Sequence, residues 1–189
     1  GLYINRALAR YYQNNLRGAM SDYDLALDID KNNFIGHYNR GLLRAQVGDD
    51  NRAIEDFDFV LQIEPDNLMA VFNRGLLRDK TGDYAGAISD YTSVLEEYPN
   101  FLAGYQYRAE ARKKVGDLKG ASQDEMKVLQ AQLDMQNGKT SRQTASADKT
   151  RKKSDKNMNN YRKIIVADSD EERSKYKTDY RGRVQDRNI

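Results

Sequence analysis

The six-residue string NRGLLR occurs twice in this chain, at 39–44 and at 73–78, and a close variant, NRALAR, lies at 5–10. Successive copies start 34 residues apart. A fixed period of this length is typical of stacked-repeat proteins, in which each unit buries its apolar face only against its neighbours. The period therefore predicts a repeat architecture with four units: 1–33, 34–67, 68–101 and 102–135.

Each unit contains a predicted turn between two helices. Three glycines keep the period, and each is followed by aspartate: Gly48, Gly82 and Gly116. Asn14 takes this place in the first unit. Glycine adopts the left-handed conformation just past a helix without strain, and asparagine is the next best residue. Each unit is therefore predicted to be a helix, a turn and a second helix. Pro65 and Pro99 are predicted to end second helices, because proline cannot continue the hydrogen-bond ladder.

Further positions keep the same period and carry a resemblance to a known family. They are a small residue in the first helix (Ala7, Gly41, Gly75, Ala109), an alanine in the second (Ala19, Ala53, Ala87, Ala121), an aromatic residue four positions later (Tyr23, Phe57, Tyr91), and leucine in the next turn (Leu27, Leu61, Leu95, Leu129). Over residues 1–137 the chain resembles the tetratricopeptide repeat (TPR), in an arginine-rich variant that contains the string NRG. The resemblance implies a mainly α fold, an α-solenoid with first helices on a concave face and second helices on a convex face.

The fourth unit departs from the pattern. Glu125 stands where the aromatic residue belongs, and Leu133 stands where proline would be. The second helix of this unit is therefore predicted to run to about Gln136 and to stop at Gly138. A terminal repeat needs a polar outer face, so this last helix is expected to present one.

The arginines of the repeated string form two series. Their members are Arg6, Arg40, Arg74 and Arg108, and Arg10, Arg44, Arg78 and Arg112. An acidic series keeps the same period in the second helices: Asp22, Asp56, Asp90 and Asp124. Because each unit supplies its own acid, we predict ladders of Arg–Asp pairs between the helices, with arginine stems packed on apolar neighbours. A basic stripe for phosphate or nucleic acid is the alternative, and it is less favoured.

One face of the first helices is the candidate binding site, which the resemblance places on the ligand side. Spacings of three and four select this face. Its partner-binding residues are Ile4, Leu8, Tyr11, Tyr12, Ile35, Tyr38, Asn39, Leu42, Met69, Phe72, Asn73 and Leu76. An apolar patch of this kind marks a partner site if it is exposed. The alternatives are that these side chains are core, or that the chain's own tail covers them.

Asparagine recurs on this face at Asn5, Asn39 and Asn73 and can bond a peptide backbone. Some members of the family grip a C-terminal carboxylate with such asparagines and with cations one turn earlier. The residues one turn earlier here are Gly1, Ile35, Met69 and Ala103. A carboxylate clamp is therefore not expected, and an apolar or amphipathic partner segment is the better candidate.

Charge divides the chain into two regions. Residues 1–135 carry 16 Lys+Arg and 21 Asp+Glu, a net charge of −5, whereas residues 136–189 carry 15 and 8, a net charge of +7. Residues 138–160 are polar, include a basic cluster at 149–156, and are predicted to be a flexible linker. Residues 161–189 are predicted to form a short strand and helix, a small partly α/β segment that is too short to bury much surface alone. It is expected to join another chain or to belong to a truncated domain; docking on the array is the less favoured alternative.

No catalytic chemistry is predicted. The chain has no cysteine, and its one histidine, His37, falls at a packing position of a first helix. No nucleophile–base pair, metal cluster or phosphate loop is recognisable, so we expect no enzyme activity, no cofactor, no metal and no small-molecule substrate. No apolar run is long enough to span a membrane. The sequence assigns no compartment.

The leading hypothesis is a non-catalytic scaffold that binds another protein or peptide on the concave face, with self-association left open. Nucleic acid is not an expected partner, since no aromatic residues interleave with the basic cluster of the tail. The alternative hypothesis is a polyanion- or envelope-associated module, which acts through the basic tail and uses the repeats as a spacer.

Overall fold

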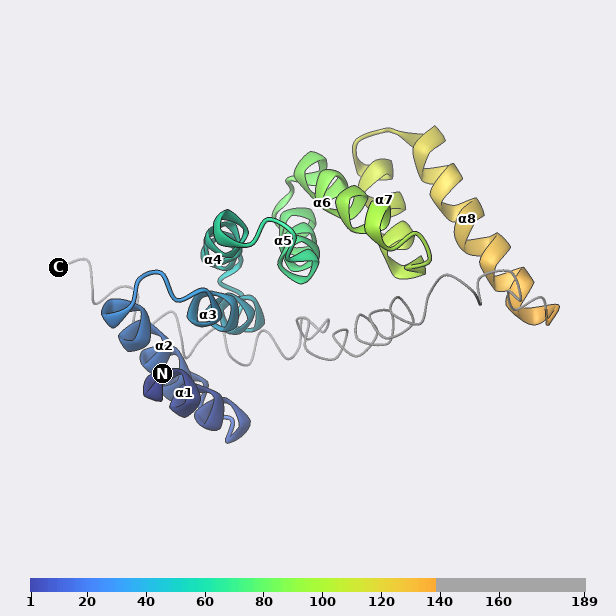
Figure 1. The fold of residues 1–189 in the computed structure, drawn as a ribbon. Helices are drawn as coiled ribbons and strands as arrows, with labels where there is room; N and C mark the ends of the chain where they lie inside the picture. Colours follow the sequence, from blue (N-terminus) through green and yellow to red (C-terminus); the bar gives the residue numbers. More distant parts are fainter. Residues whose placement is uncertain (139–189) are drawn as a thin grey trace. The chain divides into compact units, whose positions relative to one another are not determined.

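A computed structural model describes residues 1–138, which form eight α-helices joined by short turns (Figure 1). The helices are α1 (Leu2–Tyr12), α2 (Leu16–Ile29), α3 (Phe34–Gln46), α4 (Asp50–Ile63), α5 (Leu68–Thr81), α6 (Tyr84–Glu97), α7 (Leu102–Lys114) and α8 (Leu118–Gln136). Each predicted repeat therefore contains one pair of helices. The expected linker and the expected strand–helix segment begin at or beyond the end of this range, so residues 139–189 lie outside the described part.

The turns inside the repeats take the predicted conformation. Gly48, Gly82 and Gly116 have positive φ angles of 82°, 93° and 82°, and Asn14 has a φ of 60°. Gly138 follows the end of α8 with a φ of 64°. These angles lie in the left-handed region, which glycine enters freely and asparagine tolerates. The predicted helix ends are therefore confirmed, including the extension of α8 to Gln136.

Polar side chains fix the starts of most helices. Asn15, Asp83 and Asp117 each accept a hydrogen bond from the backbone N–H three residues later, at the starts of α2, α6 and α8. Asn33 does the same at the start of α3. Such caps satisfy donors that have no partner within the helix, and so they set where each helix begins.

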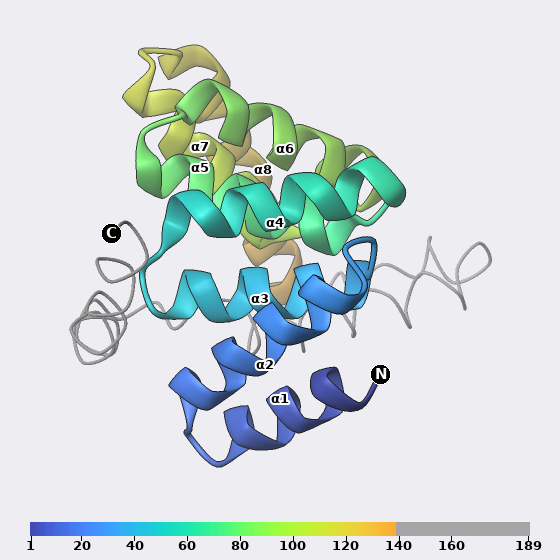
Figure 2. The ribbon, with the colours of Figure 1, turned by 90° about the vertical axis from the view of Figure 1, so that its left-hand side faces the viewer.

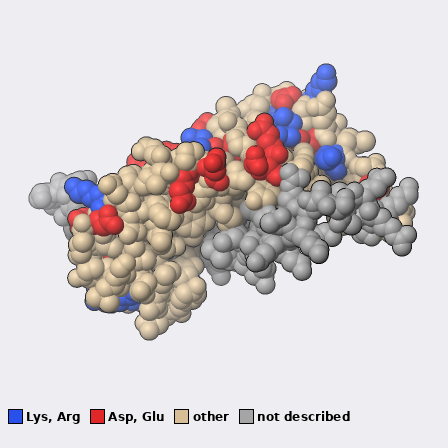
Figure 3. All heavy atoms as spheres, viewed as in Figure 1, with Lys and Arg blue, Asp and Glu red and all other residues tan. Residues whose placement is uncertain are grey.

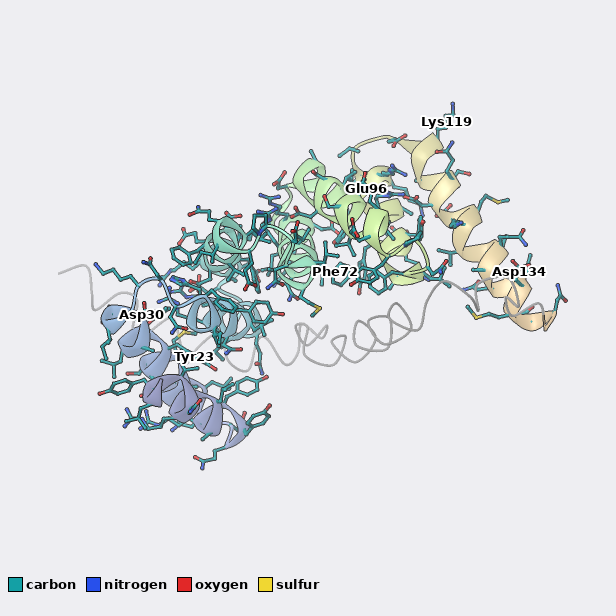
Figure 4. The ribbon with its side chains drawn as sticks, in the orientation of Figure 1. Tyr23, Asp30, Phe72, Glu96, Lys119 and Asp134 are labelled. Carbon is teal, nitrogen blue, oxygen red and sulfur yellow. The ribbon has the colours of Figure 1, made fainter. Side chains whose placement is uncertain are left out.

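The chain divides into two compact units, at a boundary inside α5: Gly1–Ala70 and residues 71–138 of the described part. In the first unit, α3 packs against both α2 and α4, and α1 packs against α2 (Figure 2). A buried cluster joins α1, α2 and α3, and Tyr23 is one of its largest members (Figure 4). Its other members are Ile4, Ala7, Leu16, Ala19, Met20, Leu43 and Val47.

Aromatic rings form the centre of the second unit. Phe72 of α5 (labelled in Figure 4) lies 5.9 Å from Tyr91, 5.1 Å from Phe101 and 5.8 Å from Tyr107, measured between ring centroids. Tyr91 stacks on Tyr107 at 5.9 Å. These edge-on and offset contacts are the arrangements that aromatic pairs prefer. They join α5, α6 and α7, and α7 packs in turn against α8.

The small residues of the first helices allow close approach of the second helices. A Cβ atom built on Gly41 would lie 3.2 Å from Asp56 Cβ and 3.3 Å from Phe57 Cζ. On Gly75 it would lie 3.0 Å from Tyr91 Cε1. Larger side chains would push each helix pair apart, which explains why only glycine or alanine occurs at this position of the repeat.

Candidate functional site

The two arginine series bind the acidic series, as the sequence predicts. In every repeat, both arginines of the first helix reach one aspartate of the second helix. The first-series pairs, with distances between guanidinium nitrogen and carboxylate oxygen, are Arg6–Asp22, Arg40–Asp56, Arg74–Asp90 and Arg108–Asp124, all at 2.7 Å. The second-series pairs are Arg10–Asp22 at 2.9 Å, Arg44–Asp56 at 2.7 Å, Arg78–Asp90 at 2.9 Å and Arg112–Asp124 at 2.8 Å.

All four aspartates are buried, so each carboxylate depends on its arginines. The hydrogen bond from Arg6 holds the pKa of Asp22 below its ordinary value, against the opposing effect of burial. For Arg40, burial opposes the charge, but hydrogen bonds to Asp56 and Asp24 outweigh it and raise the pKa. The arginines therefore form structural ion pairs. This argues against the alternative that they form a basic stripe for phosphate or nucleic acid.

The structure adds contacts between consecutive repeats that sequence reasoning missed. Arg40 donates to Asp24 of the preceding repeat at 3.0 Å, and Arg108 donates to Thr92 of the preceding repeat at 3.1 Å. Asp24 and Thr92 are two repeat periods apart in sequence. This separation was the sequence signal for a contact between repeats. It was hard to recognise because one position carries an aspartate and the other a threonine.

His37 has a structural environment in the first unit. Its Nδ1 lies 2.9 Å from Asp56 Oδ1, its Nε2 lies 3.0 Å from the carbonyl oxygen of Lys31, and its ring stacks on Phe59. Tyr105, at the equivalent position two repeats later, donates its hydroxyl to the carbonyl oxygen of Pro99. Both side chains thus connect a first helix to the loop before it. These contacts explain the presence of His37 by a structural role.

In the first unit, the candidate partner-binding residues differ in exposure. Ile4 is part of the buried core, and Leu8 and Tyr11 pack partly buried against that core. Tyr12 is exposed, and its ring meets Tyr11 edge-on at 5.7 Å. Over α1, the surface is formed mainly by residues that carry no charge (Figure 3). Tyr11 and Tyr12 therefore form the most accessible aromatic pair of the candidate face.

The face continues onto α3 within the same unit. Ile35 is 48% exposed in the first turn of α3. Tyr38, Asn39 and Leu42 follow at helical spacing and are half-buried, and the ring of Tyr38 meets Phe57 edge-on at 5.7 Å. Such half-buried side chains are held in place by packing and still expose part of their surface to solvent. We call Leu8, Tyr11, Tyr12, Ile35, Tyr38, Asn39 and Leu42 the first-helix face.

In the second unit the candidate residues lie deeper. Phe72 and Asn73 are buried, and Leu76 is half-buried, as is Met69 just before the boundary between the units. One lysine of this unit is engaged: Lys114 bonds Asp79 at 2.8 Å and lies over the ring of Tyr84. The Lys114–Asp79 hydrogen bond raises the pKa of Lys114. Acidic side chains lie over α6 in Figure 3, where Figure 4 labels Glu96.

The outer face of α8 is less polar than expected. Among the exposed side chains of this helix are five large apolar residues: Leu118, Met126, Leu129, Leu133 and Met135. The prediction rested on the need of a terminal repeat for a polar outer face. Glu125, four residues before Leu129, is exposed beside these apolar residues. Three of these residues, Met126, Leu129 and Leu133, recur at spacings of three and four, and this signal was present in the sequence.

Residues 1–138 offer neither a metal site nor a membrane-spanning helix. That range contains no group of three or more His, Asp or Glu side chains placed to hold a metal ion. None of the eight helices is both long and apolar enough to cross a membrane.

Comparison with solved structures places the fold. A structure of MamA AMB-1 has a TM-score of 0.68 at 18% sequence identity, and the match covers 78% of each chain. MamA 41-end from Desulfovibrio magneticus RS-1 has a TM-score of 0.64 at 23% identity, and the match covers 68% of this chain and 73% of that one. No family model and no curated protein matches this sequence.

A third structure is the first TPR of Spaghetti (RPAP3) bound to the HSP90 peptide SRMEEVD. Its TM-score is 0.56 at 19% identity, and the match covers 61% of this chain and 91% of that one. At these identities the similarity establishes the fold alone. The described residues form a TPR-like helical repeat structure of about four helix pairs.

Proposed function

We propose that this chain is a non-catalytic protein-interaction scaffold, built as an arginine-rich variant of the TPR solenoid. Its first-helix face binds an apolar or amphipathic segment of another protein. One observation carries the proposal: the arginines of the repeated string turn away into ion pairs, whereas tyrosine, isoleucine and leucine stay accessible beside them. A face of this composition attracts apolar side chains more than it attracts charge.

The accessible residues suit peptide recognition. Tyr11, Tyr12 and Tyr38 offer large rigid surfaces with a polar end, a combination that is enriched where proteins bind one another. Asn39 lies between Tyr38 and Leu42 on the helix and can bond the backbone of a bound segment. Met69, Phe72, Asn73 and Leu76 are proposed as further partner-binding residues on α5.

The bound segment should differ from an acidic tail. The peptide SRMEEVD in the Spaghetti (RPAP3) structure is mostly polar and contains three acidic residues. On the first-helix face, Ile35 stands where an anion-binding site would place a cation, and the nearby Arg40 is committed to Asp56 and Asp24. An amphipathic helix or an extended apolar strand is therefore the favoured ligand class.

Peptide selection tests this function. A random library of displayed 12-residue peptides is panned against the full chain at physiological salt, and recovered peptides are compared with the input. The proposal predicts enrichment of leucine, phenylalanine and similar residues at regular spacing, with binding that changes little between 0.05 and 0.5 M salt. Enrichment of acidic peptides whose binding is lost at high salt would instead favour the polyanion-binding alternative.

A further inference from the structure

The apolar face of α8 is a second surface that the first-helix site does not use. Leu118, Met126, Leu129 and Leu133 lie along one row of this helix and are exposed. Figure 4 labels Lys119 near the start of α8 and Asp134 in its last turn, which mark the two ends of the helix. The equivalent residues of the earlier repeats show what this row contacts when another helix pair follows.

The equivalent leucines of α2 and α6, Leu27 and Leu95, are buried, whereas Leu61, the equivalent residue of α4, is half-buried. Leu16 and Leu118 are three periods apart, and they are 8% and 68% exposed. Leu27 and Leu129 are likewise equivalent, and they are 5% and 48% exposed. Leu16 shares a buried cluster with Leu43 of α3 and with Val47 just past the end of α3, so the next first helix is what covers this row. No helix follows α8 among the described residues.

The internal junctions define the shape of the missing helix. At the α2–α3 junction, a Cβ atom on Gly36 would lie 2.9 Å from Leu27 Cδ2, and at the α6–α7 junction one on Gly104 would lie 2.9 Å from Leu95 Cδ2. Each leucine therefore requires a very small residue opposite it. A helix that covers Leu129 in the same way needs glycine or alanine at that point.

The junctions also define a second, chemical requirement. Four residues after each glycine, Arg40 and Arg108 donate to Asp24 and Thr92 of the preceding second helix. The equivalent position on α8 is Met126, which offers no carboxylate or hydroxyl. An arginine docked there would lose water without gaining an acceptor, so the covering helix needs an apolar residue instead.

Neither α1 nor residues 138–189 of the sequence carry these residue types at the required spacing. A second copy would bring α1, which has Leu2 and Arg6 at the two positions. After residue 137, every glycine or alanine is followed four residues later by a charged residue: Arg142, Lys149, Arg151, Glu171 and Asp186. Neither source meets both requirements.

We propose that the outer face of α8 docks an amphipathic helix of another protein, antiparallel to α8. That helix carries glycine or alanine opposite Leu129, an apolar residue four positions later opposite Met126, and apolar residues seven and eleven positions later toward Leu118. It adds to the array in the same way that α3 adds to α2. The site is separate from the first-helix face, and it does not depend on the function proposed above.

Designed helices test the docking. A labelled peptide of about 20 residues, long enough to be helical, carries Ala, Leu, Leu and Leu at the four positions, with Lys and Glu elsewhere. One control peptide has arginine at the second position, and another has leucine at the first. Fluorescence anisotropy measures binding of each peptide to the full chain and to its Leu129→Glu and Ile63→Glu variants. Ile63, on α4, is 47% exposed and so matches Leu129.

The proposal predicts that both control peptides and the Leu129→Glu variant weaken binding by at least about tenfold, while Ile63→Glu leaves it unchanged. Equal binding of the arginine peptide, no binding of the first peptide, or insensitivity to Leu129→Glu would overturn it. So would concentration-dependent self-association, seen by sedimentation, that Leu129→Glu abolishes, since a second copy would then cover the face. If Leu129→Glu fails to fold by circular dichroism, the peptide comparison on the native chain still decides.

Discussion

Arg44 Nη1 lies 2.7 Å from Asp56 Oδ2, and this pair is almost completely removed from water. Arg40 and His37 contact the same carboxylate at 2.7 and 2.9 Å. One aspartate therefore holds three cationic or hydrogen-bonding side chains of α3 onto α4. This arrangement explains why the conspicuous arginines of the repeated string are structural residues.

Removal of that carboxylate should destabilise the fold strongly. Asp56→Ala leaves Arg44 buried without its partner, and loss of one member of a buried pair typically costs about 3–5 kcal/mol. The control is Glu55→Ala, because Glu55 immediately precedes Asp56 in α4 but is exposed. This substitution should change the free energy of unfolding by less than about 0.5 kcal/mol. Urea unfolding followed by circular dichroism measures both. Equal effects would mean that the ladder contributes nothing to stability.

The acid-dependence of stability should report on Asp22. Its pKa in the folded state is lowered from 3.8 by the hydrogen bond from Arg6, so folding favours the ionised form. The stabilisation is therefore complete above the unfolded pKa of about 3.9 and disappears as the pH falls through the lower folded pKa. The difference in unfolding free energy between the native chain and Asp22→Asn should be constant from pH 7 to 5 and shrink below pH 4. A difference that grows with acid would contradict this sign.

Tyr91 carries a buried hydroxyl that has no hydrogen-bond partner among the described residues. Phe57 occupies the equivalent position one repeat earlier, so a ring without the hydroxyl fits this place. Tyr91→Phe should therefore leave thermal stability unchanged or raise the free energy of unfolding by up to about 1 kcal/mol. Tyr91→Leu is the control that removes ring contacts, and it should destabilise. A marked loss of stability in Tyr91→Phe would reveal a contact for the hydroxyl.

The turn between α5 and α6 depends on backbone freedom at Gly82, where φ is 93°. Gly82→Asn should cost little, because Asn14 already takes a positive φ at the equivalent turn. Gly82→Val should cost at least about 1 kcal/mol more, since a β-branched residue is strained in this region. Thermal melts of the two variants give the comparison, and equal melting temperatures would show that the turn can adjust.

The periodic part of the fold could be predicted from sequence because local and non-local signals agreed there. The positions of Gly48 and Pro65 fixed helix ends through backbone sterics alone, and the matched periods of Arg40 and Asp56 located a contact between helices. These are properties of one residue or of one pair, so an inspection of the sequence can detect them.

Burial on the candidate face was harder to predict. Ile4, Phe72 and Asn73 follow the same helical spacing as Tyr12 and Ile35, yet the first three are buried and the last two are exposed. Spacing identifies a row on a helix, but burial depends on which neighbouring helix covers that row. The same reason explains α8, where Leu129 repeats a core position but lacks the covering helix.

The most direct measurement of the central claim compares two isoleucines of the same repeat. Ile35 lies on the first-helix face, Ile63 lies on α4, and they are 48% and 47% exposed. The affinity of the full chain for an apolar peptide recovered from the selection is measured by titration calorimetry, with the Ile35→Glu and Ile63→Glu variants alongside. The account predicts that Ile35→Glu weakens binding by at least about tenfold and that Ile63→Glu has no effect. Equal affinities of the two variants would contradict the claim that the first helices carry the binding site.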